Sequence, residues 1–228
     1  MATLNDLARL DEDQFYDISH VSLSEIPLSS DALCPGNTSF DCRKRLIQLQ
    51  RDVVADYPIP IPQPNVPALI SPGEAVESYR KYIANHAGEP KLIAFRQLYP
   101  RILLNNYGIL ASNNHALILY FTEQMLNAHS QDFATLAQAL TLLKPDVPAS
   151  QYNQWLTVTI REAEARKIEQ QKLISDTKKQ MAALSASTDF EQKKSYWLSL
   201  KFFLERLEAT TVSADVVALH KLQQPARQ

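Results

Sequence analysis

Glycine is scarce in this chain, which has four glycines and 13 prolines among its 228 residues. So few glycines leave no glycine-rich phosphate loop and no Gly-x-Ser-x-Gly nucleophile turn. Leucine, alanine, glutamine and lysine are abundant instead, and this composition favours a mostly helical protein. The length suits one large domain or two small ones.

Cysteine is nearly as rare, with Cys34 and Cys42 alone. Two thiols cannot form a four-ligand zinc site by themselves, and His20 is the one histidine near them in the sequence. We therefore expect no metal and no cofactor. A disulfide between the two cysteines would need an oxidising compartment, and the absence of a signal peptide favours reduced thiols.

The sequence also lacks long apolar runs and a strong charge of either sign. No stretch approaches the roughly 20 apolar residues that span a bilayer. The acidic N-terminus has no apolar signal core, so we expect a cytoplasmic protein rather than a secreted one. A net charge of −2 gives no electrostatic reason to expect nucleic acid as a partner. The hydrophobic content of 45% supports a folded core.

Periodicity and punctuation predict a chain of helices. Residues 1–14 read as a loose polar arm. A helix from about residue 39 ends at Asp56-Tyr57, before a run of prolines. Ser71-Pro72-Gly73-Glu74 has the residues of a capping box and predicts a helix to about His86, with Gly88 stopping it. The further helices expected are 90–104 with a kink or break at Pro100, 113–128, 131–144, a long and largely exposed 148–185, one from 188, and 214–222.

The segment 15–86 carries short motifs in a suggestive order. Ile18 is followed by Pro27-Leu28, then by Gly36-Asn37-Thr38-Ser39-Phe40 at the start of the predicted central helix. Leu69-Ile70-Ser71-Pro72 then leads into the next helix. In this order the segment resembles the U-box, the zinc-free relative of the RING fold in ubiquitin ligases.

The resemblance implies a small α+β lobe over residues 15–87, followed by a helical domain over 88–228. It implies that Ile18, Ile70 and Pro72 bind a ubiquitin-conjugating enzyme while the helical domain recruits a protein substrate. Such a ligase acts by proximity and has no catalytic residue of its own. If the protein is a secreted bacterial effector, the compartment is the host cytosol. The segment departs from the U-box pattern at Asn37, where histidine is usual, and no basic residue follows Pro72 before Arg80.

Two other readings remain open. The chain also fits a non-enzymatic helical adaptor whose first lobe is only structural. It also fits a Cys-dependent enzyme centred on Cys42, near a helix N-terminus, if His20, His86, His115 or His129 lies beside that thiol.

The most apolar window runs from Trp197 to Leu204. With Lys193, Lys194 and Lys201 it fits a helix lying in a membrane interface. A core helix with lysines at its edge has the same pattern, and the sequence favours the core helix.

Overall fold

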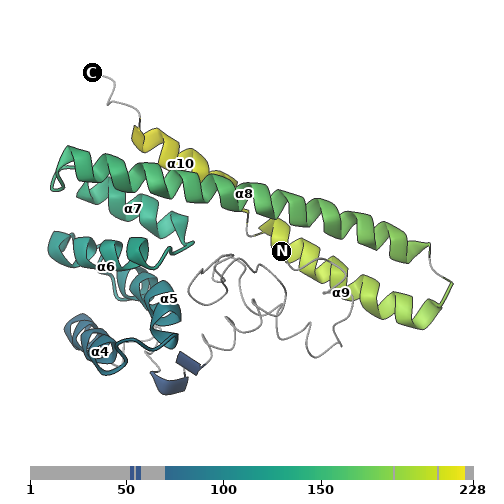
Figure 1. Cartoon of the computed structure of the whole chain (residues 1–228), viewed down its shortest axis with the longest axis horizontal. Coiled ribbons are helices and arrows are strands. Elements are labelled where there is room, and N and C mark those ends of the chain that lie inside the picture. The colour runs from purple at the N-terminus through teal and green to yellow at the C-terminus, as the bar shows by residue number, and fades with distance from the viewer. Residues whose placement is uncertain (1–51, 54, 58–69, 187, 210, 224–228) are drawn as a thin grey trace. The chain divides into compact units, whose positions relative to one another are not determined.

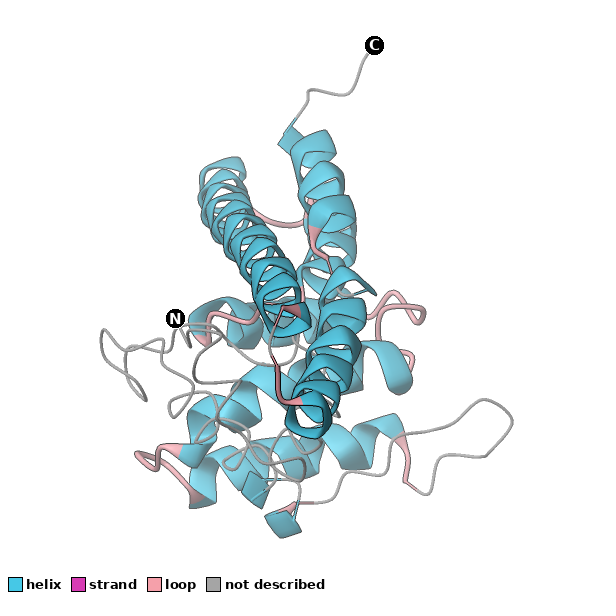
Figure 2. Ribbon diagram, turned by 90° about the vertical axis from the view of Figure 1, so that its right-hand side faces the viewer, coloured by secondary structure: helices cyan, strands magenta, loops and turns pink. Residues whose placement is uncertain are grey.

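A computed structural model of the chain describes residues 52–53, 55–57, 70–186, 188–209 and 211–223. All regular structure in these ranges is α-helix, and Figure 2 draws no strand among them. The prediction of a mainly α protein is therefore confirmed for this part of the chain. The α+β lobe predicted for residues 15–87 lies largely outside the described residues.

The chain divides into two compact units. We call the described residues of 52–163 and 215–223 the body, and the described residues of 164–214 the hairpin. Figure 1 shows their helices, which are α4 (Pro72–Asn85), α5 (Lys91–Asn106), α6 (His115–Asn127), α7 (Phe133–Leu143), α8 (Ala149–Ser185), α9 (Phe190–Ala209) and α10 (Ser213–Gln223). The first part of α8 belongs to the body and the second part to the hairpin.

Helix α4 begins with the capping box that the sequence predicts. The Glu74 amide donates to Ser71 Oγ at 3.3 Å, and the Ser71 amide donates to Glu74 Oε2 at 2.7 Å. These bonds satisfy two of the amides that a helix N-terminus leaves unpaired, and Pro72 needs no such partner. The bonds from Ser71 hold the pKa of the Glu74 carboxyl below its usual range.

Helix α5 differs from the prediction at Pro100. The sequence predicts a kink or a break there, and the break is wrong because α5 is one helix from Lys91 to Asn106. Proline removes one backbone donor from the helix ladder. The helix continues because Pro100 is itself buried, with Phe95, Leu103 and Leu104 on its two sides at 0% exposure.

An aromatic cluster forms the centre of the body. The Phe95 ring lies between those of Tyr79 and Tyr82, with centroid separations of 4.9 and 4.1 Å. Tyr99 of α5 donates its hydroxyl to the Tyr57 carbonyl at 2.5 Å, which ties the residues before the proline run to α5. These rings bury large areas of apolar surface and fix α4 against α5.

Lys91 and Asp56 add a polar tie beside the cluster. Lys91 Nζ lies 2.6 Å from Asp56 Oδ2 and 3.3 Å from Glu89 Oε2. The hydrogen bond from Lys91 holds the pKa of the Asp56 carboxyl below its usual range. The body thus contains both α4 and α5, on either side of the predicted domain boundary at residue 87.

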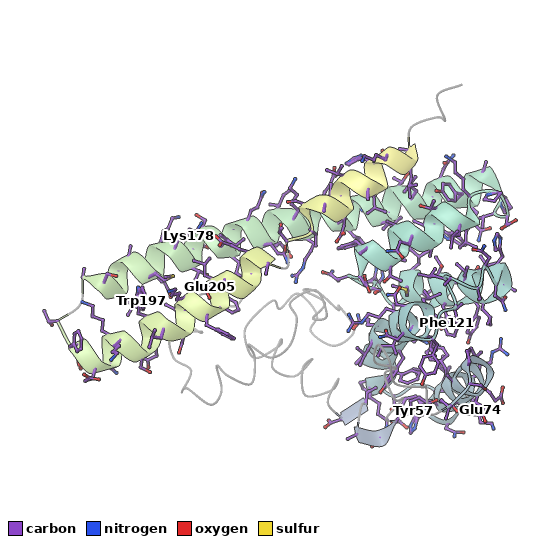
Figure 3. All side chains as sticks on the ribbon, turned by 180° about the vertical axis from the view of Figure 1, so that it is seen from behind. Tyr57, Glu74, Phe121, Lys178, Trp197 and Glu205 are labelled. Carbon is purple, nitrogen blue, oxygen red and sulfur yellow. The ribbon has the colours of Figure 1, made fainter. Side chains whose placement is uncertain are left out.

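Helix α9 runs alongside the second part of α8, and Figure 3 shows the labelled Lys178 on α8 with Trp197 and Glu205 on α9. Lys178 Nζ lies 2.9 Å from Glu208 Oε1, and the Val212 amide donates to Gln170 Oε1 at 3.2 Å. The buried apolar residues of α9 are Leu200, Phe203, Leu204 and Leu207.

The expectation of a long and largely exposed helix holds for most of α8, whose residues are mainly exposed or half-buried, but several polar positions are exceptions. Along α8, the polar residues Thr159, Arg166, Gln170 and Thr177 are all buried, at 3% exposure or less. The Thr159 and Thr177 hydroxyls donate to the carbonyls of Trp155 and Leu173 within the helix. A threonine that satisfies its hydroxyl in this way can be buried without an unpaired polar group.

Candidate interaction surfaces

The predicted docking residues are only partly within the described chain. Ile18 lies outside the described residues, so its burial and neighbours remain a prediction. Ile70 is half-buried and Pro72 is exposed, directly before and at the first position of α4. The capping box between them fixes the backbone from Ser71 to Glu74, so the two apolar side chains are presented on an ordered segment.

The residues that a Cys-dependent enzyme would use are also only partly within the described chain. Cys42 and His20 lie outside the described residues. The other three histidines proposed as its partners each lie against a carboxylate. His86 Nδ1 is 2.9 Å from Glu89 Oε1, His129 Nδ1 is 2.9 Å from Glu162 Oε1, and His115 contacts Asp146. Within the described ranges no cluster of histidine, cysteine, aspartate and glutamate has the composition of a metal site.

An open groove of about 530 Å³ lies in the body. It is formed by the C-terminal end of α5, the turn after it and the C-terminal half of α7. Its lining residues are Leu104, Asn105, Leu110, Ala111, Gln138, Thr141 and Leu142. Leu104 is fully buried, whereas Leu110 and Leu142 are only half-buried.

Hydrogen bonds hold the two helices of the groove at a fixed separation. Asn105 Nδ2 of α5 donates to Thr135 Oγ1 of α7 at 2.7 Å. The Thr135 hydroxyl in turn donates to Asp132 Oδ2 at 2.8 Å, and Asp132 caps α7 by accepting from the Thr135 amide at 3.1 Å. The groove is therefore preformed, as ligand and peptide sites usually are.

The chemistry of the groove is apolar with neutral polar edges. Four lining residues are apolar, three carry amide or hydroxyl groups, and none of the seven is charged. A charged group placed there would lose its hydration without gaining an opposite charge. Amide and hydroxyl groups can instead bond to the backbone of an incoming peptide.

Helix α9 carries a second exposed surface. Phe190, Leu198 and Phe202 are 68%, 51% and 44% exposed. Leu198 and Phe202 lie four residues apart and so share one helix face. The prediction of a core helix therefore holds for one face of α9 only, since Leu200, Phe203 and Leu204 from the same window are buried.

Sequence reasoning named the apolar window of α9 but not the groove. The groove joins residues from 104 to 142, none of which belongs to a motif. Its lining residues are ordinary helix and turn residues, and only their arrangement in space makes a site.

No helix among the described residues has both the length and the apolar character that a membrane crossing requires. Comparisons of the chain with protein-family models, with curated proteins and with solved structures give no match. The resemblance of residues 15–86 to the U-box therefore stays a prediction.

Proposed function

We propose that this chain is a non-enzymatic helical interaction protein that binds an apolar segment of a partner protein in the groove between α5 and α7. The observation that carries the proposal is the preformed, uncharged groove of about 530 Å³. Its half-buried leucines provide apolar contact surface, and Asn105, Gln138 and Thr141 offer hydrogen bonds to a backbone.

The groove favours a peptide or helix over a charged small molecule. Amphipathic helices commonly bind by placing a few apolar side chains in such a groove. A partner segment with two or three apolar residues and no charge at the contact matches this lining. Grooves of this size bury side chains rather than whole domains.

A site-specific crosslink tests this assignment. A photoreactive amino acid replaces Gln138, which is exposed and lines the groove, in the full-length protein inside cells. The same amino acid replaces Gln154 as a control, because Gln154 is exposed on α8 and does not line the groove. We expect a crosslinked partner peptide from position 138 alone, and loss of that crosslink when Ala111→Arg fills the groove. A crosslink that persists in Ala111→Arg would refute the groove as the binding site.

A second candidate is the ubiquitin ligase that the U-box resemblance implies. The exposure of Pro72 and the partial exposure of Ile70 favour it, since apolar anchors for a conjugating enzyme must be accessible. Ubiquitin-chain formation with a panel of conjugating enzymes tests it. On this candidate Ile18→Ala and Pro72→Ala abolish chain formation without loss of thermal stability. Stable variants with unchanged chain formation, or a wild-type protein inactive with the whole panel, would exclude it.

A further inference from the structure

We draw no further inference here: the strongest candidate, the exposed apolar face of α9 at Leu198 and Phe202, carries nothing because no feature of the described residues shows what covers it.

Discussion

Two buried tyrosines in the aromatic cluster are expected to respond oppositely to the loss of a hydroxyl. Tyr79 is fully buried, and its hydroxyl has no hydrogen-bond partner among the described residues. Burial raises the pKa of this hydroxyl well above its usual value. Tyr99 is also buried, but its hydroxyl donates to the Tyr57 carbonyl at 2.5 Å. Tyr79→Phe therefore removes a buried hydroxyl that has no hydrogen-bond partner among the described residues, and Tyr99→Phe removes one that makes a hydrogen bond.

The magnitudes follow from the desolvation of the hydroxyl. A buried polar group without a partner costs about 1–3 kcal/mol, so Tyr79→Phe should raise the free energy of unfolding by about 1 kcal/mol. The ring stays in place against Phe95 and Phe121, at centroid separations of 4.9 and 5.2 Å. Tyr99→Phe removes a made hydrogen bond and should lower the free energy of unfolding by about 0.5–1.5 kcal/mol.

Urea unfolding followed by circular dichroism measures both values. The dependence of the free energy on urea should be the same in the wild type and both variants, because the surface exposed on unfolding hardly changes. The difference in sign is the critical result. If Tyr79→Phe destabilises the protein as much as Tyr99→Phe does, the Tyr79 hydroxyl has a partner and the reasoning fails.

Three further perturbations test the fold. Phe95→Ala should lower the free energy of unfolding by about 3–5 kcal/mol, because it opens a cavity among four aromatic rings. Phe202→Ala, at a side chain that is 44% exposed, should lower it by less than about 1 kcal/mol. Equal losses would contradict the burial of Phe95. Ser71→Ala should lower the melting temperature through the loss of about 1 kcal/mol from the α4 cap, and Ser71→Asp should restore it. Because Lys91 lowers the pKa of Asp56, the stability that this carboxylate contributes to the fold is fully present above the ordinary aspartate pKa. That stability is lost as the pH falls through the lowered pKa of Asp56. Lys91→Met should flatten this acid limb of the stability curve, and an unchanged limb would show that the pair contributes nothing.

The helices could be predicted from the sequence because their signals are local. Ser71 and Glu74 stand three residues apart beside Pro72, and that spacing alone defines the cap. The sequence also placed the helix that ends near Lys144-Pro145, since proline cannot continue it. At Pro100 the same rule did not end the helix, and buried residues lie on both sides of that proline.

The surfaces could not be predicted, because they depend on contacts between distant residues. Polar side chains such as Arg166 and Gln170 are expected to be exposed from the sequence, yet both are buried in the folded chain. In the apolar window of α9, the four-residue spacing of Leu198 and Phe202 indicates that these two side chains share a helix face. The spacing does not indicate that this face, rather than the opposite one, is exposed. The groove brings Ala111 and Thr141 into one lining, and no local pattern in the sequence relates them.

The affinity of the groove for its partner segment tests the proposed function most directly. Once the crosslink at position 138 identifies that segment, a synthetic peptide of it is titrated into the wild type, Ala111→Arg and Ala84→Arg. Ala84 is an exposed alanine on α4 that does not line the groove. We expect Ala111→Arg to weaken binding at least about tenfold by filling the groove, and Ala84→Arg to bind as the wild type does. Equal affinities for all three proteins would contradict the assignment of the groove as the partner site.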